Sequence, residues 1–167
     1  MDATLAAGLI GAGAAILGTA AGAGTAIVVE GRRARESRAE AHRAMLRTAC
    51  SDFTAAIASV RSNSYHLSID PSAGAAIRLS MDEARAGCER LRILVSSSDT
   101  QRAARMALRH TYAIWKLAET GSDPRAAQYP EKLPAQRLRE ELTKLYRGVR
   151  RELGVLQPDD VFEDLAD

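Results

Sequence analysis

The stretch LIGAGAAILGTAAGAG, residues 9–24, lies inside a longer run, 3–29, that contains no Asp, Glu, Lys or Arg. This run consists of ten Ala, six Gly, three Thr and eight larger aliphatic residues. A helix of this length measures about 40 Å, whereas the hydrocarbon core of a membrane is about 30 Å thick. We therefore expect residues 1–29 to form a single transmembrane helix.

The glycines of this stretch do not form a nucleotide-binding motif. The pattern G-x-G occurs twice, but the third glycine position of the dinucleotide-binding fingerprint holds Ile16 in one case and Ile27 in the other. No strand pattern precedes it, and no Gly-Lys-Ser/Thr follows it as in a phosphate-binding loop. In a water-exposed helix, six glycines would cost about 6 kcal/mol relative to alanine. In hydrocarbon the helix is favoured despite its glycines, because backbone groups without a hydrogen-bond partner are too costly inside a membrane.

Small and bulky residues segregate on opposite faces of this expected helix. The bulky face carries Leu5, Leu9 and Ile16, and the small face includes Gly18-x-x-x-Gly22. Small residues at this spacing let two helix backbones approach closely in a bilayer. We predict self-association of the chain into a homo-oligomer through this helix. The predicted helix-packing face comprises Thr4, Gly8, Gly11, Ala14, Gly18, Gly22, Thr25 and Ala26.

Basic residues follow the uncharged run directly, with six Arg against three Glu in residues 30–47. The positive-inside rule then places the N-terminus outside the cell membrane and the following domain in the cytoplasm. We expect residues 30–43 to form a basic juxtamembrane helical stalk. The side chains expected to contact anionic lipid headgroups are Arg32, Arg33, Arg35 and Arg38. The near balance over the whole chain, 23 basic against 21 acidic residues, gives no reason to expect nucleic acid as a partner.

Apolar residues in 44–155 recur at alternating spacings of four and three, which is typical of helical bundles. Aromatic residues make up only 4% of the chain, and no alternating β-branched pattern appears. The predicted fold class is therefore all-α, with the single N-terminal transmembrane helix continuing into a cytoplasmic antiparallel bundle of about four helices. We call the row of core-facing residues on each expected helix its seam. The seam of the first bundle helix is expected to comprise Leu46, Cys50, Phe53, Ile57 and Val60. The seam of the second is expected to comprise Ile77, Met81, Ala84, Cys88, Leu91 and Val95.

Helix boundaries follow from capping signals. Asp70-Pro71 predicts the start of the second helix. Ser98, with Gln101 three residues later, predicts the start of the third. Gly121 is expected to end the third helix, and the fourth is expected to run from Pro134 to Gly154. Residues 156–167, with five acids and no base, are expected to be a disordered acidic tail.

Residues able to bind a metal or perform catalysis are few. Cys50, Cys88 and His110 fall on three different expected helices, and the sequence leaves open whether they converge. Both cysteines occupy seam positions, where cysteine behaves as a small core residue, and His110 is expected to be about half-exposed. We therefore predict no metal, no cofactor and no enzymatic activity. Tyr129, in the longest expected loop, is the aromatic residue best placed to contact a partner.

These features favour a membrane-anchored helical bundle that acts as an interaction or assembly module, with an unknown protein partner. One alternative is a membrane-active oligomer, pore-forming or holin-like, in which the threonines of the small face line a polar path. Another is a soluble assembly protein whose Gly/Ala-rich helix packs against protein instead of lipid. A helical bundle alone does not decide among these functions.

Overall fold

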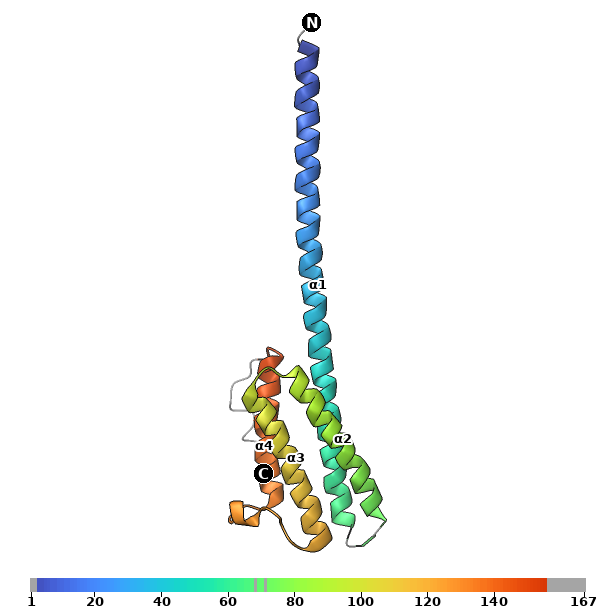
Figure 1. Cartoon of the computed structure of the whole chain (residues 1–167), viewed down its shortest axis with the longest axis vertical. Coiled ribbons are helices and arrows are strands. Elements are labelled where there is room, and N and C mark those ends of the chain that lie inside the picture. The colour runs from blue at the N-terminus through green and yellow to red at the C-terminus, as the bar shows by residue number, and fades with distance from the viewer. Residues whose placement is uncertain (1–2, 68, 71, 156–167) are drawn as a thin grey trace. The chain divides into compact units, whose positions relative to one another are not determined.

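The computed structural model describes the backbone of residues 3–67, 69–70 and 72–155, and the side chains of these residues from Glu30 onward. Four α-helices follow one another within these described residues: α1 Ala3–His66, α2 Ala73–Leu94, α3 Ser98–Thr120 and α4 Pro134–Glu152 (Figure 1). A short 3-10 helix, η1 Ala126–Gln128, lies in the loop before α4. No strand occurs in the described part of the chain. The predicted all-α class with four helices is therefore confirmed.

The chain divides into two compact units, residues 1–42 and 43–167. In the first unit, every side chain that the structure describes, from Glu30 to His42, is exposed. None of the helices, over the residues described, combines the length and the apolar character needed to cross a membrane. The predicted span over residues 1–29 falls on side chains outside the described residues.

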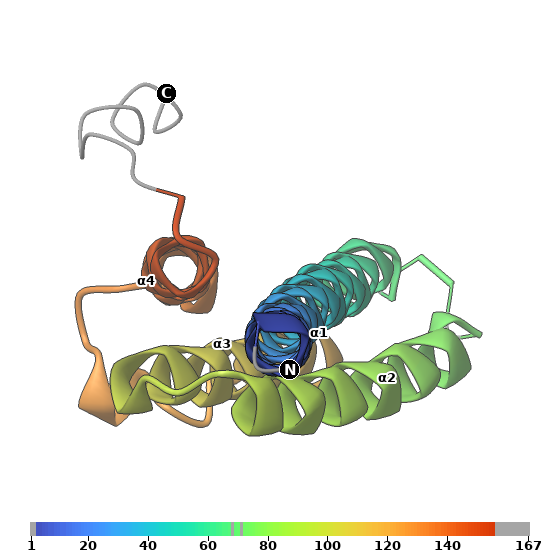
Figure 2. The ribbon, with the colours of Figure 1, turned by 90° about the horizontal axis from the view of Figure 1, so that it is seen from above.

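The helices of the second unit pack as antiparallel neighbours. Asp52 of α1 pairs with Arg90 of α2 at 3.3 Å, and Ser59 lies 2.8 Å from Ser80, hydroxyl to hydroxyl. Because residue numbers rise on one helix as they fall on the other, these contacts define an antiparallel pair. Seen from above, α3 has α2 on one side and α4 on the other (Figure 2).

The core consists of the apolar seams that the heptad spacing predicts. All eleven residues of the first two seams are buried, with Phe53, Val60 and Ile77 fully enclosed. In α4, Leu138, Leu145 and Val149 are buried as well. The core is therefore made mainly of aliphatic side chains, as the low aromatic content requires.

Two glycines let helices approach more closely than other residues would. A Cβ added at Gly87 would lie 3.0 Å from the backbone of Phe53, where α2 meets α1. A Cβ added at Gly148 of α4 would overlap the hydroxyl of Thr100 on α3 and lie 2.7 Å from its Cγ2. The α3–α4 contact therefore depends on the missing side chain at Gly148.

Some helix ends differ from the sequence-based expectation by one or two residues. The N-cap of α2 is Ser72, not Asp70, whose carboxylate instead accepts a hydrogen bond from the Ser72 amide at 2.8 Å. The N-cap of α3 is Ser97, not Ser98. With Ser97 as the N-cap, Gln101 is not the capping-box residue, and its amide donates to the carbonyls of Arg92 and Val95 at the end of α2. Gly121 follows α3 with φ +71°, as predicted.

Substituting Gly148→Ala is expected to lower the free energy of unfolding by about 2 kcal/mol, because the new methyl group displaces Thr100 from a packed interface. Thermal or urea unfolding followed by circular dichroism measures the change. The matched control is Gly74→Ala, where the added Cβ meets only Leu67 Cδ1 at 3.9 Å and the end of the Arg78 side chain at 4.0 Å. An equal loss of stability in both variants would contradict the assignment of the close contact to Gly148.

Candidate functional site: the groove between α3 and α4

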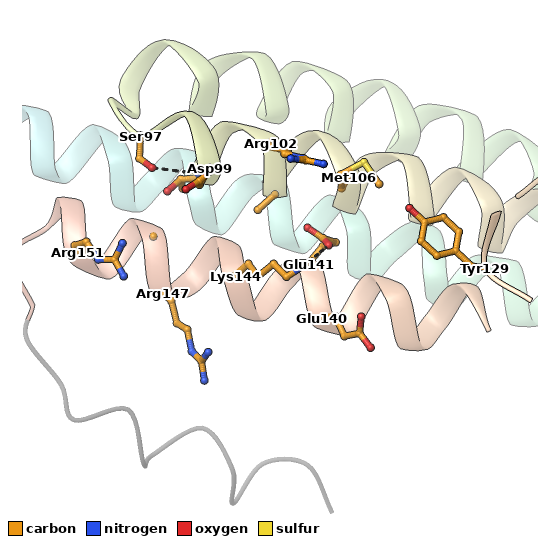
Figure 3. A pocket seen from close by; sticks show the side chains of 13 residues that line it. Ser97, Asp99, Arg102, Met106, Tyr129, Glu140, Glu141, Lys144, Arg147 and Arg151 are labelled. Carbon is orange, nitrogen blue, oxygen red and sulfur yellow. Dashed lines mark hydrogen bonds and ion pairs between the residues drawn. The ribbon is translucent and has the colours of Figure 1, made fainter. Parts of the chain in front are cut away.

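A groove of about 650 Å³ lies between α3 and α4 on the surface of the second unit (Figure 3). Its floor includes Ala103 and Met106 of α3 and Gly148 of α4. The side chains that surround this floor are mostly charged: Asp99, Arg102, Glu140, Glu141, Lys144, Arg147 and Arg151.

Helical spacing explains why these side chains face one groove. The α3 residues recur at intervals of three or four, at 99, 102–103 and 106, and the α4 residues at 140–141, 144, 147–148 and 151. Residues three and four apart lie on the same face of a helix. Since α3 and α4 touch at Thr100 and Gly148, the two faces form the walls of a single groove.

The two ends of the groove differ in charge. At the end near Tyr129, Lys132 pairs with Glu140 at 2.6 Å and Lys144 with Glu141 at 2.7 Å, so both acids there are neutralised. The other end is lined by Arg102, Arg147 and Arg151 and by one acid, Asp99. That acid lies in the first turn of α3, where the helix dipole favours a negative charge. Of the arginines at this end, Arg102 and Arg151 form no ion pair with a described residue.

The arginine-rich end is fixed by a cap that joins the two helices. Glu152, the last residue of α4, accepts hydrogen bonds from the backbone amides of Ser96 at 3.0 Å and Ser97 at 2.9 Å. Its carboxylate thereby satisfies donors just ahead of the start of α3, and the negative charge is stabilised by the dipole of that helix. The end of α4 is held against the start of α3.

Tyr129 closes the other end and covers a buried cluster. Its ring makes an edge contact with His110, with ring centroids 5.4 Å apart, and the guanidinium of Arg137 lies 4.7 Å from its centroid. Arg137 is only 1% exposed and forms an ion pair with Asp123. Asp123 also accepts a hydrogen bond from the Arg125 amide at 2.8 Å. The loop between α3 and α4 is therefore attached to α4 through a buried ion pair.

His110 is neutral in this cluster at physiological pH. Its pKa is lowered to about 4, chiefly by burial and also by the positive charges of Arg137 and Arg125, against smaller opposing effects of Glu141 and Asp123. Its Nδ1 atom has no hydrogen-bond partner among the described residues, and the same holds for Nε of Arg137. Protonation of His110 would place a second positive charge beside a buried guanidinium.

The candidate site residues predicted from the sequence lie in different parts of the second unit. The expectation that His110 is half-exposed is wrong, because it is 1% exposed. Tyr129 lies in the groove wall. Cys50 and Cys88 are free thiols in the main core, where burial raises the pKa of both. Within the described residues, no three His, Cys, Asp or Glu side chains are grouped in a way that could hold a metal ion.

The predicted membrane-facing residues belong to the first unit. Arg32, Arg33, Arg35 and Arg38 are all exposed. The predicted packing face, from Thr4 to Ala26, lies on side chains outside the described residues, and so does the predicted acidic tail over 156–167. These assignments stay predictions.

Sequence reasoning missed Arg137 and the groove. Arg137 sits beside seam residue Leu138, and its burial depends on Asp123 in a distant loop, which no local pattern reveals. The sequence does carry a signal for the groove, because Lys144, Arg147 and Arg151 recur at helical spacing next to Gly148. Comparison with known proteins adds no further guide, as no family model, curated protein or solved structure matches this chain.

Asp123→Asn is expected to lower the free energy of unfolding by about 3 kcal/mol, because it leaves the Arg137 charge buried without its carboxylate. Chemical unfolding followed by circular dichroism measures the loss. The matched control is Asp82→Asn, which breaks an exposed pair with Arg85 and should cost less than about 1 kcal/mol. If both variants lose the same stability, the buried pair does not hold the loop.

His110 is expected to make the protein less stable as the pH falls from about 6.5 to about 4. In this window the unfolded chain binds a proton at His110 that the folded chain does not, so acid favours unfolding by up to about 3 kcal/mol. A His110→Gln variant should lose less stability than the parent protein between pH 7 and pH 4. His66→Gln, at an exposed site, is the control and should show the parent's pH dependence.

Proposed function

We propose that this protein is a membrane-anchored helical-bundle interaction module, in which residues 3–29 form the anchor and the α3–α4 groove binds a protein partner. The observation that carries the proposal is the run of 27 uncharged residues followed at once by arginines at 32, 33, 35 and 38. The proposed anchor rests on the sequence of residues 3–29, since no helix over the described residues, α1 included, has the length and apolar character of a membrane span.

The backbone of α1 supports this proposal. The helix continues without interruption from Ala3 to His66, and a helix is one of the two structures that satisfy all backbone groups inside hydrocarbon. Every described side chain from Glu30 to Met45 is exposed. Exposed arginines directly after an apolar helix are placed to meet anionic headgroups, with about 1 kcal/mol of attraction per residue near the surface.

The proposed orientation follows from the same arginines. Basic residues are retained on the cytoplasmic side of a membrane, so the bundle that follows them would be cytoplasmic. The small face from Thr4 to Ala26 would then be free to pack against another helix in the bilayer, and a second copy of this chain is the partner we propose there.

The groove supports the interaction part of the proposal. Its floor is apolar at Ala103 and Met106, its walls are charged, and it lies on two helices that are fixed to each other at both ends. An apolar floor with charged walls suits a peptide or helix that presents both kinds of side chain. We propose the groove as the surface that binds the partner protein.

Membrane extraction tests the anchor. The full chain is expected to stay in the membrane pellet after an alkaline wash of cells that express it. An Ile16→Arg/Leu17→Arg variant places two charges at the centre of the span, at a cost of about 3 kcal/mol each, and should move to the supernatant. Ile93→Arg, on a side chain of α2 that is 83% exposed, is the matched control and should stay in the pellet.

Release of the parent protein by the wash would contradict the anchor and favour a soluble assembly protein. Retention accompanied by leakage of dye from vesicles that contain the protein would favour the membrane-active oligomer instead.

A further inference from the structure

Two arginines that line the groove near the start of α3 have no ion-pair partner among the described residues. Arg102 and Arg151 are exposed, and neither forms an ion pair with a described residue. They lie on opposite walls, one on α3 and one on α4 (Figure 3). Met106 and Ala103 supply apolar surface between the walls. This end is therefore suited to a segment that carries both carboxylates and apolar side chains.

The chain leaves α4 at this same end. Gly154 has φ +71°, and the amides of Gly154 and Val155 donate to the carbonyls of Arg151 and Arg150 at 3.1 and 3.0 Å. These bonds form the helix-terminating motif in which a left-handed glycine turns the chain out of the helix. The residues that follow Val155 therefore start within one turn of Arg151.

The remaining segment, 156–167, has the matching chemistry. It contains five acids and no base, with Val161, Phe162 and Leu165 interspersed among them. As a helix its 12 residues would span about 18 Å, and the part of α4 that lines the groove, from Glu140 to Arg151, spans about 17 Å by the same rise per residue. In extended form the segment would reach about twice as far, so its length is sufficient in either form.

We propose that residues 156–167 bind in the α3–α4 groove of their own chain, with Asp159 and Asp160 pairing with Arg151 and Arg102. Phe162 then packs on the apolar floor beside Met106, a contact that thioether and aromatic groups favour. This inference rests on the proposed role of the groove as the interaction surface. In this proposal the tail regulates that site. It occupies the groove, and a partner protein with an acidic, apolar segment must displace it.

Methyl NMR on the full chain in detergent micelles tests the proposal. The chain has four methionines, so methyl labelling of Met gives few signals, and Met106 reports on the groove. A nitroxide spin label is attached at Ala166→Cys, and the same reagent on the parent protein controls for reaction at the buried Cys50 and Cys88. We expect loss of the Met106 signal, with recovery after chemical reduction of the label, while Met81 in the core is less affected.

Charge reversal separates ionic docking from simple proximity. In an Arg102→Glu/Arg151→Glu variant the Met106 signal should be retained, and adding Asp159→Lys/Asp160→Lys should remove it again. Arg61→Glu/Arg78→Glu makes the same charge change at exposed positions on α1 and α2, and the Met106 signal should still be lost. Salt at about 1 M, where charges are screened within about 3 Å, should restore part of the signal.

Three results would overturn the proposal. The first is a Met106 signal that persists in the labelled parent protein, and the second is its equal loss in the Arg102→Glu/Arg151→Glu variant. The third is broadening in a mixture of spin-labelled chains with separate methyl-labelled chains, which would assign the tail to a second copy. Failure here leaves the membrane-extraction result untouched, so the failure of tail docking and the failure of the anchor can be distinguished.

Discussion

The contact between Gly148 and Thr100 sets the distance between α3 and α4, and the groove exists because that distance is short. At this point a methyl group on α4 would overlap the Thr100 side chain, so the two helix faces meet with no side chain between them. Residues one turn away on each helix are then brought together around a narrow apolar floor. A wider spacing would separate Arg102 from Arg151 and remove the shared surface.

Two polar contacts at opposite ends of the groove hold the same helix pair. At one end Glu152 accepts hydrogen bonds from the amides of Ser96 and Ser97, ahead of α3. At the other, Arg137 of α4 pairs with Asp123 in the loop and lies against Tyr129, which in turn contacts His110 of α3. A buried ion pair adds less to stability than its Coulomb energy suggests, because both charges lose their hydration. Its contribution here is to fix the position of the loop, so that Tyr129 becomes a wall of the groove.

The sequence determined the helices and the core better than it determined the site. All eleven residues that apolar spacing identified on the first two bundle helices are buried, because burial of an amphipathic stripe depends on local periodicity. Arg137 and His110 were not identified as buried, because their burial depends on residues from another segment. The cap of α3 is Ser97 instead of Ser98, and the Gln101 amide is hydrogen-bonded to the end of α2. Local patterns therefore predict which face is buried, whereas polar pairs between segments require the tertiary structure.

The pairing of charges in the groove determines which further charged group would be favoured there. Both acids near Tyr129 already have lysine partners, so an added cation gains little at that end, whereas an added carboxylate gains most beside Arg102 and Arg151. The chain itself places five carboxylates after Val155, and a tethered segment competes at a high effective concentration, in the millimolar range for a short flexible linker. If the tail docks as proposed, a partner protein would have to offer more apolar contact than the tail, or more acidic residues, to occupy the groove. Under this proposal, selectivity for such a partner would arise from competition within the chain as well as from the groove.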